Sequence, residues 1–173
     1  MPPSLSEPPG LDAAAADIFL SLKTRRAGAI KGESVAADHQ DAIVVDGWSW
    51  GISASSAIGA TQATARRSYK HLTVCKRLDC ATTALMSVLT TNDEVKEARL
   101  SMRKAGGGQI DYFSITLNSA RVVAVELDCD ASGQTTERIS FVFNKVQVEY
   151  TAQQGSGLRG ASSSFNDEIL ESA

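Results

Sequence analysis

The sequence predicts a mainly β protein: a β-barrel of two antiparallel sheets with one flanking α-helix. Three observations support this fold class. Most of the chain alternates apolar and polar residues with a period of two, which is typical of half-buried strands. One segment, residues 79–92, has the period of a helix instead. All four prolines lie within the first nine residues, so backbone hydrogen bonds can form throughout the rest of the 173-residue chain.

The predicted strands follow one another along most of the chain. In the first strand, Ile18, Leu20 and Leu22 share one face. The triple glycine Gly106–Gly108 supplies the positive φ that a hairpin turn needs between two later strands. Further strands are expected within residues 43–53, 72–75, 97–103, 112–117, 123–127 and 139–150.

The last long strand contains a change of phase. Its apolar residues occupy odd positions in 139–143 and even positions in 146–150. A strand cannot keep one face buried across such a change. We therefore expect either a β-bulge near Asn144–Lys145 or a change of partner sheet there, and both devices bend a sheet toward a barrel.

One helix is expected to pack against the barrel. Asp79 can cap its N-terminus, and it should end near Asn92. Its threonines are poor helix formers, so packing must hold it in place. Its apolar face consists of Ala81, Ala84, Leu85, Val88 and Leu89, spaced at i, i+3, i+4, i+7 and i+8.

The chain divides into three segments. Residues 16–153 are expected to form one domain, which agrees with the length. A disordered proline-rich leader at 1–15 precedes it, and a Gly/Ser-rich segment at 154–173 with a possible last strand follows. Residues 54–70 have no clear period and are expected to form a loop, which at this length is usually functional or mobile.

Composition excludes several classes of protein. A net charge of −3 argues against a nucleic-acid binder, and no apolar run approaches the roughly 18 residues of a membrane span. The N-terminus lacks the features of a secretory signal, so export needs another route.

Three cysteines, Cys75, Cys80 and Cys129, fit thiols kept reduced in a cytoplasm. A zinc site that added His71 would lack the usual close cysteine pair.

No motif in the sequence predicts catalysis. There is no nucleophile elbow, no HExxH and no GK[ST] after a glycine loop. Arg103-Lys104 before the triple glycine could indicate a phosphate cradle, but the strands on both sides favour a hairpin. We therefore predict a protein that is not an enzyme and has no catalytic, metal or cofactor site.

Several local strings, taken in order, resemble Hcp, the haemolysin-coregulated protein family of the bacterial type VI secretion system. The resemblance covers about residues 16–153, and the shared order and spacing of the strings carry it. The strings are Ile30-Lys31-Gly32-Glu33-Ser34, Asp38-His39, Trp48-Ser49-Trp50-Gly51, Ala84-Leu85-Met86, Arg103-Lys104-Ala105-Gly106-Gly107 and Phe143-Asn144-Lys145-Val146-Gln147-Val148-Glu149-Tyr150.

The resemblance implies a structural function. Such a protomer is a β-barrel that assembles into a hexameric ring with a wide channel, and the rings stack into a tube. The tube is driven out by a contracting sheath, carries a spike protein at its tip and transports effector proteins in the channel. The implied protein resides in the bacterial cytoplasm before firing and is then secreted without a cleaved signal peptide. Neither nucleic acid nor membrane is an expected partner.

Roles for individual residues follow as hypotheses. Ser49 lies opposite Trp48 and Trp50 in the alternation, so we expect Ser49 to face the channel and both tryptophans to lie in the barrel core. The remaining candidates, for contacts with the next protomer or ring, are Arg66, Arg67 and Lys70.

Three departures from the family pattern bear on ring stacking and on docking of the C-terminal segment. The 54–70 loop has only Gly59 where glycines are usual, the stretch 23–29 is longer than usual, and Asp167 stands where an aromatic residue is common.

Two other functions stay open. A monomeric barrel that binds a small ligand inside has few of the ten aromatics left for a pocket, and no residue constellation supports a small hydrolase.

Overall fold

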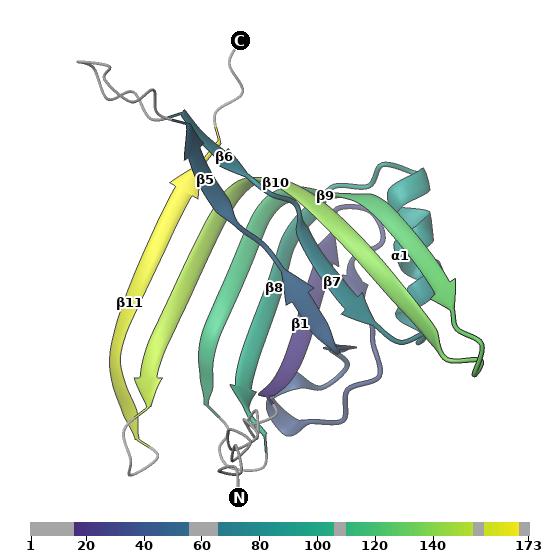
Figure 1. The fold of residues 1–173 in the computed structure, drawn as a ribbon, viewed down its shortest axis with the longest axis horizontal. Helices are drawn as coiled ribbons and strands as arrows, with labels where there is room; N and C mark the ends of the chain where they lie inside the picture. Colours follow the sequence, from purple (N-terminus) through teal and green to yellow (C-terminus); the bar gives the residue numbers. More distant parts are fainter. Residues whose placement is uncertain (1–15, 56–65, 106–109, 154–157, 170–173) are drawn as a thin grey trace, which may run out of the picture.

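The structure is a computed structural model that describes residues 16–55, 66–105, 110–153 and 158–169 (Figure 1). The predicted leader, the triple-glycine turn and Gly59 lie outside these residues. The described elements confirm a mainly β protein with one α-helix. They are β1 (Ala16–Thr24), β2 (Ala29–Ile30), η1 (Ala37–His39), β3 (Ile43–Val45), β4 (Gly47–Ser49), β5 (Ile52–Ser55), β6 (Arg66–Tyr69), β7 (Leu72–Lys76), α1 (Ala81–Thr90), β8 (Val95–Lys104), β9 (Asp111–Cys129), β10 (Thr135–Gln153) and β11 (Arg159–Glu168).

Nine of the strands form one antiparallel sheet, in the order β2-β1-β8-β9-β10-β7-β4, with β11 added to β10 and β3 added to β1. The sequence predicts two sheets of a barrel, but here β9 and β10 are each 19 residues long and run through both halves of one curved sheet (Figure 1). Among the described residues, a second sheet consists of the two strands β5 and β6.

The predicted change of phase in β10 is confirmed. Buried side chains occupy odd positions up to Phe143, and the next buried one is Val146. At this point β10 changes one neighbour: Glu137–Phe141 pair with β7, and Lys145–Gln153 pair with β11. The other neighbour, β9, bends with it, because Ser119 opposite this point has a φ of 48°. The sheet therefore curves where β10 exchanges partners.

The stretch 43–53 is not the single strand that the alternation predicts. It divides at Asp46, whose N–H donates to the Cys75 carbonyl at 2.8 Å, so that β3 pairs with β1 while β4 pairs with β7. The alternation in 43–53 predicts that Val44 faces the core with Trp48 and Trp50, but Val44 is 48% exposed while both its neighbours are buried. The stretch thereby links strands from the two ends of the sheet.

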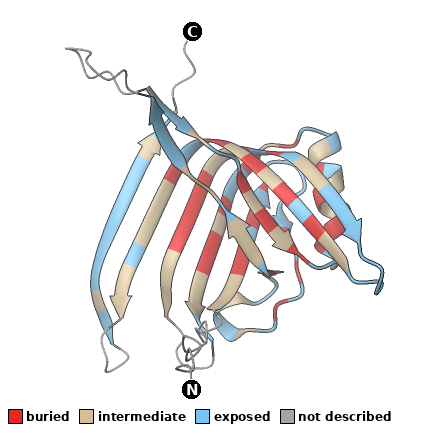
Figure 2. Ribbon diagram, in the orientation of Figure 1, coloured by how far each residue is buried: buried red, intermediate tan, exposed pale blue. Residues whose placement is uncertain are grey.

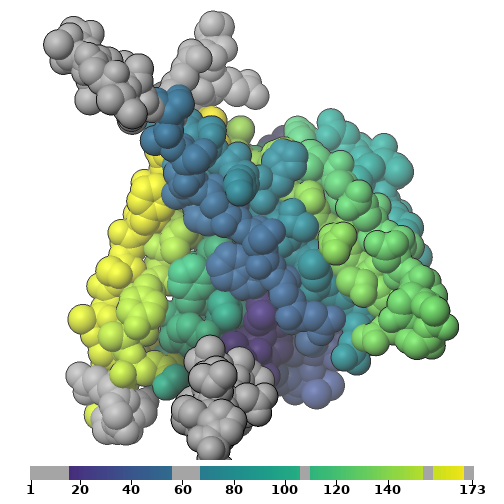
Figure 3. Space-filling view, in the orientation of Figure 1, coloured from purple at the N-terminus to yellow at the C-terminus, as the bar shows by residue number. Residues whose placement is uncertain are grey.

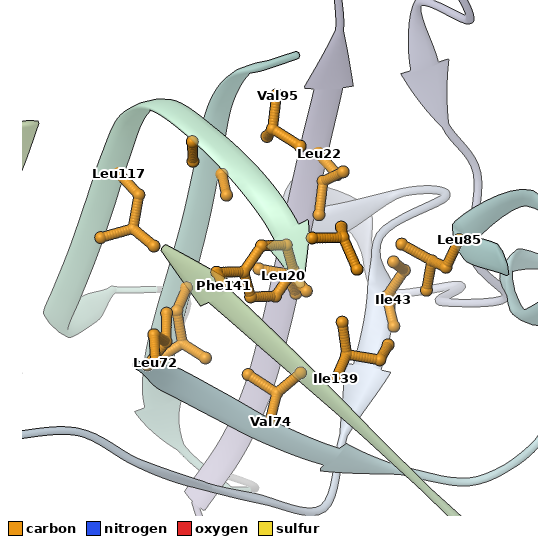
Figure 4. Packing of buried hydrophobic residues seen from close by; sticks show 14 of the residues in the cluster. Leu20, Leu22, Ile43, Leu72, Val74, Leu85, Val95, Leu117, Ile139 and Phe141 are labelled. Atoms are coloured by element: carbon orange, nitrogen blue, oxygen red, sulfur yellow. The ribbon is translucent and has the colours of Figure 1, made fainter. Parts of the chain in front are cut away.

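The core lies inside the curve of the sheet. Figure 2 shows the buried positions as alternating bands along the central strands, and Figure 4 shows side chains from both halves of the sheet converging with Leu85 of α1. The fully buried residues of the cluster include Leu20, Ile43, Leu72, Val74, Leu85, Leu100, Ile115, Leu117, Ile139 and Phe141.

Helix α1 covers one side of this core, as predicted. Asp79 Oδ1 accepts the Ala81 N–H at 2.9 Å, and Glu33 Oε1 accepts the Cys80 N–H at 3.1 Å. These two carboxylates satisfy N–H groups that have no partner within the helix. Gly32, the residue before Glu33, lies close to the backbone of Ala42, and the Gly32 N–H donates to the Asp41 carbonyl at 2.8 Å.

Candidate assembly surfaces

A row of small polar side chains crosses the outward face of β4, β7 and β10. Ser49 pairs with Thr73, and Thr73 pairs with Ser140, whose hydroxyl lies 3.0 Å from that of Thr73. Ser49 is exposed and the other two are half-buried. Because Val74 and Ile139 on the alternate positions are fully buried, the pleat directs this row away from the core. We call the row Ser49, Thr73 and Ser140 the serine face.

The side chains of the two tryptophans lie on the opposite side of the sheet from the serine face, toward the core. Both are half-buried and pack against the core cluster. The Trp48 ring stacks on Phe113 with 5.7 Å between centroids, and its Nε1–H donates to Met102 Sδ at 3.3 Å. The Trp50 ring stacks on Tyr69 at 6.0 Å.

The prediction of a loop over 54–70 is wrong at both ends, because the chain forms paired strands there. β5 and β6 pair from Ile52 with Tyr69 to Ser55 with Arg66, which leaves only 56–65 outside the described residues. We call β5 and β6 the ribbon. It crosses the front of the sheet toward the end of β11 (Figures 1 and 3). The described side chains of β5 are all exposed, so no apolar face signalled a strand.

Arg66 and Arg67 lie in β6, and Lys70 follows it with an exposed side chain. Arg67 binds its own chain. Its Nε donates to Asp167 Oδ2 at 2.5 Å and its Nη2 to Oδ1 at 3.1 Å, a bidentate pair. The Tyr69 hydroxyl also donates to Asp167 Oδ2. We call Arg67, Tyr69 and Asp167 the latch, because they join the ribbon to β11.

The latch groups shift one another's pKa values. The Tyr69 hydroxyl, with Arg67, lowers the pKa of Asp167 below 3.8. Burial and the Asp167 carboxylate raise the pKa of Tyr69, and the hydrogen bond to Asp167 raises that of Arg67. Near neutral pH the latch therefore consists of a carboxylate, a guanidinium and a neutral phenol.

An apolar surface lies uncovered where β10 meets β11. Val148 pairs with Phe165, and Tyr150 is the diagonal neighbour of Phe165 on the same face. Tyr150 is 50% exposed and Phe165 is 43% exposed. Within the described residues β11 pairs with β10 alone, and Figure 2 shows β11 as exposed along most of its length. We call Val148, Tyr150 and Phe165 the apolar edge.

The remaining features of the described residues concern metal binding, cysteine chemistry and membrane spans. These residues contain no group of three or more His, Cys, Asp or Glu side chains that could hold a metal ion, and their three cysteines are free thiols. No helix in the described part of the chain has the length and hydropathy of a membrane span.

Comparisons with known proteins agree with one another. A family model described as "Type VI secretion system effector, Hcp" matches residues 19–150. "Protein hcp1" of Pseudomonas aeruginosa is 32% identical over 149 residues, which cover 84% of this chain and 89% of that protein.

Solved structures show the same likeness. The crystal structure of Hcp1 from Salmonella typhimurium has a TM-score of 0.71 at 26% identity and covers 90% of this chain and 95% of its own. A structure of a type six secretion system protein has a TM-score of 0.80 at 21% identity, with coverage of 90% and 96%. Family model, relative and fold all confirm the resemblance found in the sequence, and the chain belongs to the Hcp family of type VI secretion system proteins.

Proposed function

We propose that this chain is a structural subunit of a type VI secretion tube, which closes into a hexameric ring and stacks with other rings. The observation that carries the proposal is the apolar edge. A monomer leaves Tyr150 and Phe165 about half exposed to water, and within the described residues β11 has β10 as its one neighbouring strand. Exposed apolar surface next to an open strand edge is typical of a protein interface.

In this proposal, the curved sheet of each subunit is the β-barrel of a tube protein. The segment from β3 to β4 connects β1 with β7, so the strands curve around the core as two layers. In the ring, the apolar edge of one subunit then packs against the neighbouring subunit. Such a ring is built from a rigid unit, because the middle parts of the central strands bury their inner faces in the core.

The serine face is our candidate for the channel wall. Small hydroxyl side chains keep a surface wet and without apolar patches, which suits a passage for folded effector proteins. Ser49 is the exposed member of this face, and Trp48 and Trp50 anchor its strand from the inner side.

The ribbon is our candidate for the contact with the next ring. It carries Arg66 and Arg67 in β6 and ends beside Lys70. Because Arg67 binds Asp167 of its own chain, its part in this contact is to hold the ribbon in place. Lys70 has an exposed side chain and is the residue we assign to the neighbouring ring.

The partners follow from the same proposal. They are copies of this chain, a spike protein at the tip, sheath proteins around the tube and effectors inside it. The subunit acts from the bacterial cytoplasm, is secreted without signal cleavage and performs no chemical step. The alternative, a monomer with a ligand inside its barrel, finds no support in the comparisons. The interior that such a ligand would need is filled by buried side chains such as Leu100, Ile115 and Phe141.

Size-exclusion chromatography with light scattering tests the proposal through matched variants of one strand. Phe165→Glu places a charge in the apolar edge and should reduce a hexamer to single chains. Asn166→Glu adds the same charge one residue away, on the opposite face of β11 beside Gln147, and should leave the hexamer intact. A wild-type protein with the mass of one chain, or a hexamer that tolerates Phe165→Glu, contradicts the proposal.

A further inference from the structure

The latch joins the two surfaces on which assembly depends. Asp167 lies two residues after Phe165 on β11, and the pleat places both on the same face. Its carboxylate binds Arg67 and Tyr69, which belong to the ribbon. We propose that Asp167 is a positioning residue that couples the ring contact at the apolar edge to the pose of the ribbon. This inference rests on the proposed function of both surfaces.

The ribbon has few other attachments that could fix its pose. The described side chains of β5 are exposed. At its root, Lys70 N–H donates to the Gly51 carbonyl at 2.9 Å, and the Tyr69 ring packs between Trp50 at 6.0 Å and Phe143 at 5.6 Å. These contacts hold the root of the ribbon but leave its direction free. Within the described residues, the side-chain hydrogen bonds that tie β6 to β11, about one hundred residues later in the chain, come from Arg67 and the Tyr69 hydroxyl.

The contact at Asp167 is sensitive to direction. The Arg67 fork binds both carboxylate oxygens, and its Nη2 also donates to the Glu168 carbonyl at 3.3 Å. Three bonds from one planar group fix the orientation of β6 against the end of β11. A rotation of the ribbon away from β11 therefore breaks all of them together.

Coupling of this kind acts in both directions. If a neighbouring subunit packs on Phe165, it restrains β11, and the restrained Asp167 then holds the ribbon more firmly. By linkage, a ribbon docked on another ring stabilises β11 for its lateral contact to the same extent. The expected consequence is that a closed ring stacks more readily than a free subunit, so that rings form before tubes.

Hydrogen exchange read by mass spectrometry on the full chain tests this coupling. Asp167→Asn keeps the size of the side chain and removes its charge. We expect hexamers to remain, as judged by light scattering. Exchange at the amides of β5 and β6 should accelerate about tenfold, since a charge-assisted bond is lost, while exchange in the core strands stays unchanged. Tubes seen by electron microscopy should become shorter or absent. Asp128→Asn, at an exposed position in β9 outside the latch, is the matched control.

A second variant keeps the test decisive if Asp167→Asn folds poorly. Tyr69→Phe removes one hydroxyl bond and keeps the aromatic packing, so it should accelerate ribbon exchange by a smaller factor with the fold intact. Ribbon exchange that stays at the wild-type rate in both variants overturns the inference, and so does loss of hexamers with an unchanged ribbon. A wild type that is monomeric refutes the proposed ring instead, and ribbon exchange in that monomer still decides whether the latch positions the ribbon.

Discussion

The Lys76 ammonium lies 2.6 Å from Glu137 Oε2, and both side chains are completely buried. Lys76 also contacts Asp79 Oδ1 at 2.7 Å and Thr82 Oγ1 at 3.2 Å, and the Thr82 hydroxyl donates to Glu137 Oε2 at 2.7 Å. This network joins β7 and β10 to the first turn of α1. It fixes where the helix lies on the sheet, because an apolar contact alone would allow the helix to slide.

Removal of the lysine should be costly. Lys76→Met leaves Glu137 buried without its cation, and we expect the free energy of unfolding to fall by about 3–5 kcal/mol. Urea denaturation followed by circular dichroism measures the change. Lys145→Met, at an exposed lysine paired with Glu168 at 3.4 Å, should change stability by less than about 1 kcal/mol. In the double variant Lys76→Met, Glu137→Leu, most of the loss should be recovered; a double variant as unstable as Lys76→Met refutes the role of the unpaired charge.

Two glycines give a paired test of the backbone near the helix. A Cβ at Gly32 would lie 2.4 Å from the Ala42 carbonyl oxygen and 2.5 Å from Ile43 Cα, whereas one at Gly47 would meet no atom within 4 Å. Gly32→Ala should therefore destabilise the protein by about 3 kcal/mol or more, since backbone atoms must move. Gly47→Ala should be neutral or stabilising by up to about 1 kcal/mol. Equal melting temperatures for the two variants would show that the close approach at Gly32 is absent.

The assignment of Trp48 to the core and Ser49 to the outside can be measured on neighbouring residues. Trp48→Ala removes the ring stacked on Phe113 and should cost about 3 kcal/mol. Ser49→Ala alters an exposed hydroxyl with no described hydrogen bond and should stay within about 0.5 kcal/mol of the wild type. Chemical denaturation gives both values, and a larger loss for Ser49→Ala contradicts the facing of this strand.

The latch predicts a one-sided response to pH. Because the pKa of Asp167 is lowered in the folded chain, its contribution is complete above the ordinary value of 3.8 and disappears as the pH falls through the lowered value. Tyr69, with a raised pKa, remains neutral throughout the acidic and neutral range. Ribbon exchange, corrected for its intrinsic pH dependence, should thus be constant between about pH 5 and 8 and rise only below about pH 4. A release of the ribbon between pH 5 and 7 would exclude Asp167 as the group responsible.

Alternation along the chain could predict the strands, the helix and the bend in β10, because each of these buries one face. The same pattern places Lys76 on the face of Leu72 and Val74, and Glu137 on the face of Ile139. Their burial could have been inferred from the sequence, but their pairing requires the register between β7 and β10.

The ribbon and the latch could not be predicted. β5 buries no face, and its four residues include only one large apolar side chain, Ile52, so its alternation is too short and too weak to predict a strand. Arg67 and Asp167 meet across about one hundred residues, and the departure from the usual aromatic at position 167 gave no indication of its partner. The exposure of Phe165 likewise depends on β11 lying at the end of its sheet, which is a property of the topology.

Electron microscopy of the purified wild-type chain tests the central claim most directly. Class averages should show closed six-fold rings with an open channel, and concentrated samples should show stacks of such rings. Particles of single-chain size at every concentration, without rings, would contradict the assignment of this chain as a tube subunit.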